Sequence, residues 1–267
     1  MAGEQQATNQ SVERAAAVLA AFSDTRALRV ADVANRAGLG QSTTSRMLAT
    51  LEALAYVERD AAGTYRLGAA LIELSAAALN QHPVFRAGRQ PVQDLAGRTG
   101  LGANLSVLRD WSVLYLANFE GPDAPRAATL AGRHNPLHAT GMGKCLLLGS
   151  TPEQRRDLLG ELQSFTRHTI TGHDALDDDL DRTRERGYAT EIEELAFGRA
   201  CVAAPVHDAD GLVVAAVSIS GSLSVIDLAR RERELSVQAI ETADAISVTL
   251  GYTSPAEVGT VPPAGRS

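Results

Sequence analysis

The pattern of residues 10–68 constrains the fold most strongly, because it places three short amphipathic helices directly before a hairpin. Apolar residues recur at i, i+3, i+4 and i+7 in 12–19 and again in 30–37, which is the spacing of one helix face. Gly38 follows the second repeat, where a left-handed residue commonly ends a helix, and a third apolar stripe runs over 47–55. This order of elements predicts a winged helix-turn-helix.

Candidate caps and a hairpin signal complete this pattern. Ser11 precedes the first helix and Ser42 the third, and a serine hydroxyl accepts hydrogen bonds from backbone N–H groups at a helix start. The segments YVERD and TYRLG alternate polar and apolar residues around Ala-Ala-Gly. We therefore expect a two-stranded wing within 56–68.

The third helix supplies candidate DNA contacts, since the first residues of a recognition helix reach base edges. They are Gln41, Ser42, Thr43, Thr44, Ser45 and Arg46. Glutamine pairs with adenine, arginine pairs with guanine, and a threonine methyl touches the methyl of thymine. On the hairpin, Arg59 and Arg66 are expected to hold the DNA backbone or the minor groove. The alternative is a small helical subdomain that docks another protein.

Charge is distributed in a way that fits a local DNA contact. The net charge of −7 argues against non-specific nucleic-acid binding by the whole molecule, yet residues 26–50 hold four arginines and one acidic residue. A single wing makes few phosphate contacts, and affinity grows with their number. We therefore expect a homodimer, or a homotetramer built as a dimer of dimers, that reads two half-sites of a double-stranded operator.

The sequence of the remaining chain predicts a helix that joins the wing to a mixed α/β domain. The fold class expected for the whole chain is therefore α+β. Residues 69–80 have high helix propensity, Pro91 is expected to open another helix, and strands are predicted around Asp110. Further strands are predicted at 188–192, 200–206 and 212–220, before a last helix over 227–250. The expected divisions are a disordered tail over 1–9, the winged domain over 10–68, a linker helix over 69–86, an effector domain over 87–251 and a disordered tail over 252–267.

Composition narrows the cellular context. No apolar run approaches the ~20 residues that span a bilayer, and the polar start MAGEQQATNQ is unlike a signal peptide. Two cysteines far apart, Cys145 and Cys201, are typical of reduced thiols. We expect a soluble cytoplasmic protein with no membrane partner.

The stretch NPLHATGMGKCLLLG, residues 135–149, holds the chain's only lysine, Lys144. A Walker phosphate loop needs glycine at 138 and a hydroxyl residue at 145, where His138 and Cys145 stand. A dinucleotide fingerprint fails because position 146 is leucine. Two interpretations remain: free amides of Gly141 and Met142 that receive a small anion or carbonyl, or a tight turn that binds nothing.

Catalytic and metal chemistry find weaker support. Cys145 near a helix start is a candidate thiolate with His138 as its base, but buried structural cysteine is the commoner case. His134 and His138 are four residues apart, yet Pro136 lies between them, so no helix aligns them as metal ligands. We predict no catalytic residue, no metal and no cofactor.

Three segments together resemble the IclR family of bacterial transcriptional regulators, over about residues 10–250. They are VADVANRAGLGQSTTSRMLATLEALAYVERDAAGTYRLG, NPLHATGMGKCLL, and RERGYATEIEELAFGRACVAAPVHDADGLVVAAVSISG. The resemblance implies a GAF-like α/β effector-binding domain with a cleft over its sheet. Matching the motifs of relatives that bind small carboxylates implies six effector-binding residues: Gly141, Met142, Glu191, Cys201, Ser218 and Ser220.

Two of these positions depart from the family pattern, and others have plain structural explanations. Glu191 stands where relatives often have aspartate, and Met142 is bulkier than the small residue common there, so an effector that is smaller or differently shaped than that of any relative is expected. Alternation places Ser218 and Ser220 on one strand face, although ordinary strand hydroxyls fit equally. Cys201 fits either core packing or a pocket wall.

The sequence therefore predicts an allosteric transcriptional regulator whose operator binding is modulated by a small-molecule effector, expected to be an organic acid. One rival is a small-molecule enzyme with an accessory helix-turn-helix module. Another is a ligand-sensing module that docks protein rather than DNA.

Overall fold

A computed structural model describes residues 9–23, 27–124 and 129–253. The chain divides into two compact units, one ending at Gln81 and the other beginning at His82. We call them the N-terminal and C-terminal units. The predicted tails over 1–9 and 252–267 lie outside the described residues, except for Asn9, Tyr252 and Thr253.

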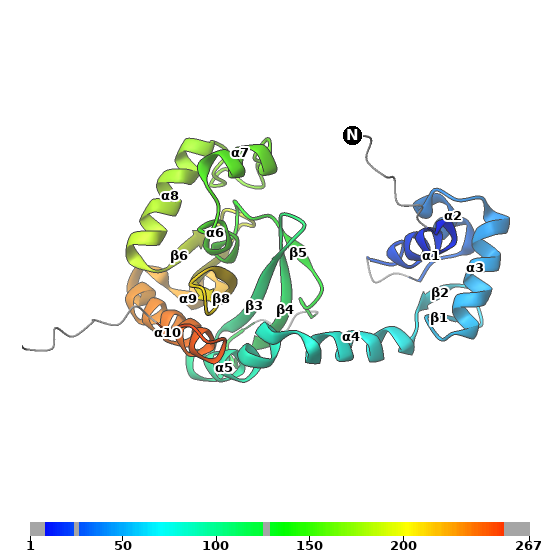
Figure 1. Cartoon of the computed structure of the whole chain (residues 1–267), viewed down its shortest axis with the longest axis horizontal. Helices are drawn as coiled ribbons and strands as arrows, with labels where there is room; N and C mark the ends of the chain where they lie inside the picture. The colour runs from blue at the N-terminus through cyan, green and yellow to red at the C-terminus, as the bar shows by residue number, and fades with distance from the viewer. Residues whose placement is uncertain (1–8, 24–26, 125–128, 254–267) are drawn as a thin grey trace, which may run out of the picture. The chain divides into compact units, whose positions relative to one another are not determined.

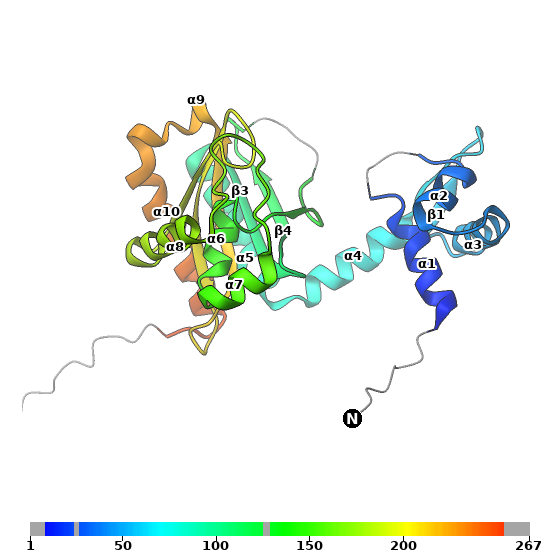
Figure 2. The same cartoon turned by 90° about the horizontal axis from the view of Figure 1, so that it is seen from above.

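The N-terminal unit has the predicted order of helices and hairpin. Its elements are α1 (Gln10–Ala20), α2 (Val30–Ala37), α3 (Gln41–Ala53), β1 (Val57–Arg59), β2 (Tyr65–Leu67) and α4 (Ala69–Gln81). Helices α1 to α3 cluster beside the hairpin, whereas α4 extends away from them (Figure 2). The fold of this unit is therefore a winged helix-turn-helix, as the sequence predicted.

Helix starts in this unit differ from the expected caps. Asn9 caps α1, because its Oδ1 accepts from the Ser11 N–H at 3.1 Å, so Ser11 is capped rather than capping. Helix α3 begins one residue after Gly40, which places Ser42 inside the first turn. Gly38 has φ of +66° and ends α2, as the pattern indicated.

A compact apolar core holds the three helices and the wing together. Its buried members are Val18, Ala21, Phe22, Leu28, Val33, Leu48, Leu51, Val57 and Tyr65. Leu28 and Tyr65 also exchange backbone hydrogen bonds of 2.9 and 2.7 Å, and this antiparallel bridge joins the segment before α2 to strand β2 of the wing. This pairing crosses the whole motif, so it is not visible in local periodicity.

The C-terminal unit is an antiparallel sheet between two helical layers. Its elements are α5 (Pro83–Thr99), β3 (Gly102–Arg109), β4 (Ser112–Glu120), β5 (His134–Asn135), α6 (Gly141–Leu147), α7 (Pro152–Leu159), α8 (His173–Arg186), β6 (Ala189–Ile192), β7 (Arg199–His207), β8 (Val213–Ser222), α9 (Leu223–Ile226) and α10 (Leu228–Thr249). The strand order is β5-β4-β3-β8-β7-β6, with every pair antiparallel.

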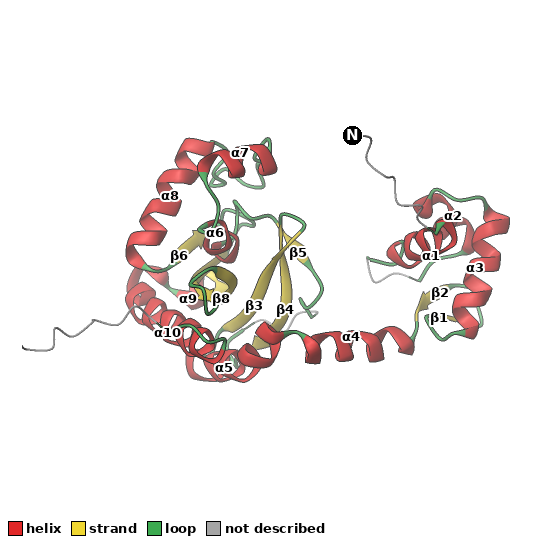
Figure 3. Ribbon diagram, viewed as in Figure 1, coloured by secondary structure: helices red, strands yellow, loops and turns green. Residues whose placement is uncertain are grey.

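The two sheet faces carry different helices. Helices α5 and α10 pack on each other and on one face, whereas α6 packs on the other face against β7 and β8 (Figure 1). Helices α7 and α8 lie beyond α6 on that side (Figure 3). The core between α6 and the sheet includes Leu137, Met142, Cys145, Leu180 and Ala203. The α6 face is therefore where the glycine-rich stretch meets the strands.

Helix α5 differs from the expectation in its start. It begins at Pro83, which occupies the first turn where a missing N–H costs nothing, and Pro91 lies inside the helix. The linker helix α4 accordingly ends at Gln81, so the compact units divide five residues before the predicted boundary after 86. The elements β5 and α9 were not predicted, because two and four residues are too short to show a period.

Candidate functional site

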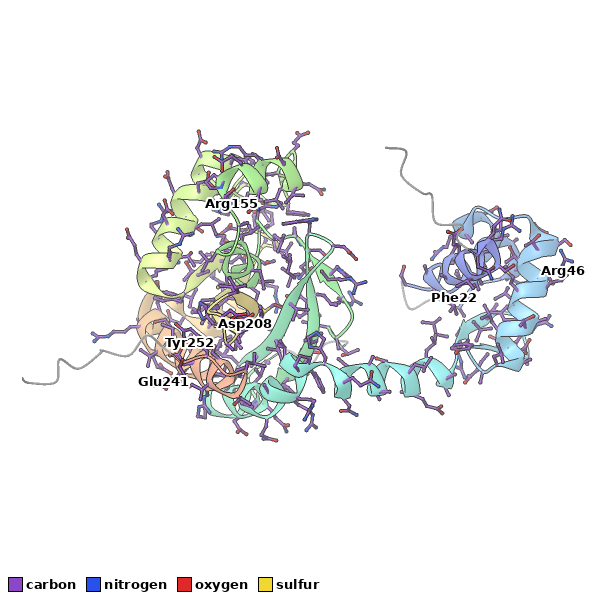
Figure 4. All side chains as sticks on the ribbon, viewed as in Figure 1. Phe22, Arg46, Arg155, Asp208, Glu241 and Tyr252 are labelled. Atoms are coloured by element: carbon purple, nitrogen blue, oxygen red, sulfur yellow. The ribbon has the colours of Figure 1, made fainter. Side chains whose placement is uncertain are left out.

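The first turns of α3 present most of the predicted DNA-reading side chains to solvent. The exposed ones are Gln41, Ser42, Ser45 and Arg46. Figure 4 shows Arg46 at the surface of α3. Thr43 is half-buried, and Thr44 is fully buried with its hydroxyl donating to the Gly40 carbonyl at 3.1 Å. Thr44 lies on the inward stripe of α3, so its hydroxyl serves the helix start rather than an exposed face.

The wing presents two arginines with different partners. The Arg59 guanidinium lies over the Tyr65 ring, 5.5 Å from its centroid. The Arg66 Nη2 atom donates to Glu58 Oε2 at 2.8 Å, and both side chains are largely exposed. Exposed ion pairs contribute only about 0–1 kcal/mol, so exchanging Glu58 for a phosphate costs Arg66 little.

A groove of about 510 Å³ lies between α1 and α3. Arg14 of α1 and Arg46 of α3 both line it, beside the apolar Met47, Leu51 and Leu54. Arg14 therefore adds a second positively charged side chain to the surface that carries Arg46. The helix-turn-helix pattern did not single out Arg14, because its position opposite α3 depends on helix packing.

A second cavity, of about 200 Å³, lies between the sheet and the start of α6. Its lining includes Met142, Glu191, Cys201, Ser218 and Ser220, five of the six residues that the resemblance implied. Strand register explains their convergence, since Glu191 pairs with Cys201 and Cys201 with Ser220, and paired residues point to the same face.

Gly141, the sixth residue, does not line this cavity. A Cβ at this position would lie 2.9 Å from Cys201 Sγ and 3.3 Å from Ala203 Cβ. The position thus admits glycine because α6 starts against β7. Thr140 caps the helix, with its Oγ1 accepting from Gly143 N–H at 3.1 Å, and it lines the cavity although it was not predicted.

The two predicted serines share a partner that the sequence did not indicate. Asn104 Nδ2 donates to both Ser218 Oγ and Ser220 Oγ at 3.1 Å. A hydroxyl that accepts one hydrogen bond keeps its own proton for another acceptor. The serine pair is therefore a candidate donor set for a ligand oxygen.

Glu191 supplies the carboxyl group of the cavity and is 6% exposed. Its Oε1 accepts from the N–H groups of Glu194 at 2.7 Å and Leu195 at 3.2 Å. Burial raises the pKa of Glu191, and these N–H groups oppose that rise. One carboxyl oxygen thus anchors the loop after β6, so the ligand wall and this loop are joined at one residue.

Lys144 binds carboxylates of the protein itself. Its Nζ lies 2.6 Å from Glu194 Oε1, 2.9 Å from Asp179 Oδ2 and 3.2 Å from the Thr190 carbonyl, and the residue is 1% exposed. Burial raises the pKa of Glu194 to about 7, although Lys144 opposes that rise. The lysine of the glycine-rich stretch is therefore used to fasten α6 to α8 and to the loop after β6.

Cys145 and His138, the candidate thiolate and its base, are both buried. Cys145 is fully buried, and burial raises the pKa of its thiol to about 12, so the thiol stays protonated. His138 bonds through Nε2 to the Gln163 carbonyl at 2.9 Å, and burial lowers its pKa.

Within the described ranges no three His, Cys, Asp or Glu residues gather as a metal site. No described helix is long and apolar enough to cross a membrane.

Four further polar residues line the cavity without having been predicted as ligand contacts: Asn104, Tyr115, Asn135 and Arg199. Asn135 Nδ2 donates to the Tyr115 hydroxyl at 3.0 Å, a contact that depends on pairing of β4 with β5. Arg199 is two residues before Cys201, so strand alternation alone could have placed it on the same face.

Together, the two units define a helix-turn-helix DNA-binding protein that carries an α/β unit with an internal cavity. Comparison with protein-family models finds the IclR helix-turn-helix domain over residues 11–61 and the bacterial transcriptional regulator IclR C-terminal domain over residues 76–248. The chain therefore belongs to the IclR family of bacterial transcriptional regulators. The predicted family and fold class are confirmed.

Relatives and solved structures agree with this assignment. The glycerol operon regulatory protein of Streptomyces coelicolor is 35% identical over 91% of this chain and 96% of its own. The regulator XynR of Escherichia coli is 33% identical over 91% and 98%. An IclR regulator structure from Alicyclobacillus acidocaldarius matches with TM-score 0.82 and 31% identity over 91% and 100%. An IclR homologue from Microbacterium hydrocarbonoxydans, complexed with 4-hydroxybenzoate, matches with TM-score 0.78 and 26% identity over 90% and 98%.

Proposed function

We propose that this regulator binds a duplex operator through its N-terminal unit and releases or retains it according to a small organic acid bound in the cavity over the sheet. The observation that carries the proposal is the cavity itself, where Glu191, Ser218 and Ser220 converge with Asn104 and Arg199 in about 200 Å³. Ligand pockets typically join a few placed polar groups to an apolar wall. The homologue with 4-hydroxybenzoate supports an organic acid as the ligand class.

For the DNA contact, we propose that α3 enters the major groove with its exposed side chains Gln41, Ser42, Ser45 and Arg46, joined by Thr43. Arg59 and Arg66 of the wing hold the DNA backbone. Thr44 is left out of this set because it is buried. Sequence is read by base-edge contacts, whereas phosphate contacts set position and orientation.

We further propose that the protein acts as a homodimer or a dimer of dimers. Helix α4 supports this assembly, because none of its residues is buried in the described chain and Ile72 and Leu74 are 73% and 53% exposed. Exposed apolar residues on one helix are typical of an unpaired interface. Sedimentation of Ile72→Glu against the unaltered chain tests this, with dissociation expected and an unchanged mass as the contrary outcome.

The proposed regulation requires that effector binding differ between two states of the protein. A ligand shifts an equilibrium only by its differential affinity for the two states. The loop anchored by Glu191 and Lys144 joins the cavity wall to α8, so ligand contact with Glu191 acts on a segment held by other elements.

A DNA-binding titration tests the regulator against its rivals. With a duplex from the gene's own upstream region, affinity is expected to fall as salt rises, because phosphate contacts release counterions. Arg46→Ala is expected to lose about 1–3 kcal/mol of specific binding. The exposed Arg230→Ala of α10 is the matched control. Unchanged affinity of Arg46→Ala would favour a module that docks protein.

A further inference from the structure

The cavity over the sheet has two charged lining residues among those described, and they differ in depth. Glu191 is buried, whereas Arg199, at the first position of β7, is exposed. Cys201 lies between them in the register, because it pairs with Glu191 and follows Arg199 by two residues. Two residues of strand span about 7 Å, so along β7 the Arg199 end and the Glu191 end of the cavity are separated by the length of a small molecule.

Arg199 has a guanidinium without a protein partner in the described chain. No ion pair or side-chain hydrogen bond joins the guanidinium to a described residue, and the backbone of Arg199 is held by Ser222 of β8 and by the Glu193 N–H, which donates to its carbonyl at 2.8 Å. Glu120 shares a small adjoining hollow with Arg199, yet no ion pair joins the two side chains. By contrast, Glu191 already accepts two backbone hydrogen bonds. The mouth of the cavity therefore holds a guanidinium that no described side chain binds, whereas the inner end holds a carboxyl group with one oxygen already hydrogen-bonded to the backbone.

These two ends favour different ligand groups. A guanidinium binds a carboxylate through two parallel hydrogen bonds, and Arg199 is free to do so. A second carboxylate at the inner end would face Glu191 and repel it. A hydroxyl there can donate to Glu191 and accept from the Ser218 and Ser220 hydroxyls, which Asn104 holds in place.

We infer that Arg199 is a specificity-determining residue, which binds the carboxylate of a small hydroxy-monocarboxylic acid whose hydroxyl lies at the Glu191 end. This inference rests on the proposed function, that the cavity holds an organic acid effector. It adds the orientation of the bound ligand in the cavity and excludes dicarboxylates as effectors. A volume of about 200 Å³ is below the ~300–1,000 Å³ of sites for drug-sized ligands, so the acid is small.

Calorimetric titration of the full chain tests this assignment. The probes are glycolate, lactate, glycerate and 4-hydroxybenzoate, each beside its uncharged carboxamide, with succinate and terephthalate as dicarboxylates. The tightest acid is expected to bind at least tenfold better than its amide. Arg199→Gln is expected to lose about tenfold for the acid and little for the amide, and Arg199→Lys to recover part of the loss. Arg230→Gln, at an exposed site of α10, is the control for loss of a surface charge.

Each outcome decides the inference. If Arg199→Gln keeps the acid-to-amide ratio, or if a dicarboxylate binds the unaltered chain better than every hydroxy acid, the inference is wrong and the proposed effector cavity stands. If no probe binds the unaltered chain, the organic-acid effector and the role of Arg199 both fail. In support, Glu191→Gln, which keeps the oxygen that accepts from Glu194 and Leu195, is expected to reduce the discrimination against dicarboxylates at least fivefold.

Discussion

Lys144 illustrates how one residue can carry a structural role that its neighbours in sequence disguise. Glycines precede it as they would in a phosphate loop, yet its ammonium is enclosed by Glu194, Asp179 and the Thr190 carbonyl. A buried charge is stable only when it is paired and hydrogen-bonded. The three contacts come from α8 and from the segment that carries Glu191, so the lysine positions the inner end of the cavity.

Replacing this lysine tests its structural role. Lys144→Met leaves the buried Glu194 carboxyl without its cation and leaves Asp179 with Arg182 alone, and we expect the C-terminal unit to lose about 3–5 kcal/mol of unfolding free energy. Urea titration followed by circular dichroism measures the loss. Combining Lys144→Met with Glu194→Gln should recover part of it, whereas Arg184→Met, in an exposed pair with Asp181, should change little. A large loss in the control and none in Lys144→Met would contradict this role.

The Glu194 carboxyl makes stability depend on pH. Its pKa is raised to about 7 from 4.5, chiefly by burial, so the folded chain binds this proton more tightly than the unfolded chain. The associated stability is present below pH 4.5 and is lost as pH rises through 7, at no more than about 1.4 kcal/mol per pH unit. Buried His138, with a lowered pKa, acts in the opposite direction, so only comparison with a variant isolates Glu194.

The comparison uses unfolding free energies of the unaltered chain and Glu194→Gln between pH 5 and 8. We expect the unaltered chain to lose stability relative to the variant as pH rises through this window. Asp181→Asn, at an exposed site of α8, is the control. Parallel curves for Glu194→Gln and the unaltered chain would mean that Glu194 titrates normally.

At the scale of elements, the first turn of α6 depends on close backbone contact. A Cβ on Gly143 would lie 2.1 Å from the Leu137 carbonyl oxygen and 2.5 Å from Leu137 Cα. Backbone atoms cannot yield as a flexible side chain can, so the helix would have to move away from the preceding loop. The glycine-rich stretch therefore serves packing at Gly143 as it does at Gly141.

Alanine substitutions separate the two kinds of glycine in this stretch. Gly143→Ala is expected to lower the melting temperature of the C-terminal unit, with a cost of about 1–3 kcal/mol or more. Gly149→Ala is the matched control, because nothing lies within 4 Å of a Cβ there and its φ is not positive. We expect that control to be neutral or slightly stabilising. Equal effects of the two variants would refute the close contact.

At the scale of the whole molecule, each compact unit has its own buried core. Leu48 belongs to the core of the N-terminal unit and Leu180 to that of the C-terminal unit, and both are fully buried. Deleting buried methyl groups costs about 2–5 kcal/mol for leucine to alanine. We expect Leu48→Ala to shift one calorimetric transition and Leu180→Ala another. If both variants shifted a single common transition, the two units would unfold together.

Sequence alone determined the features that depend on neighbours along the chain. Periods of 3.6 and 2 can be recognised within a single segment of the chain. They predicted the two motif helices, the wing, the long α10 and the alternation of Ser218 with Ser220. The cavity residues Glu191, Cys201 and the two serines were predicted from the resemblance to the IclR family, and the strand register shows that they share one face.

Only the tertiary structure decided which of these residues are available and what they contact. Thr44 turned out to be buried, Gly141 to pack on Cys201, and Arg199 to share a cavity with Glu191. Asn104 meets Ser218 across 114 residues of sequence, and Lys144 meets Glu194 across 50. Such contacts arise from strand order and helix packing, which bring distant segments together and leave no periodic trace in either one.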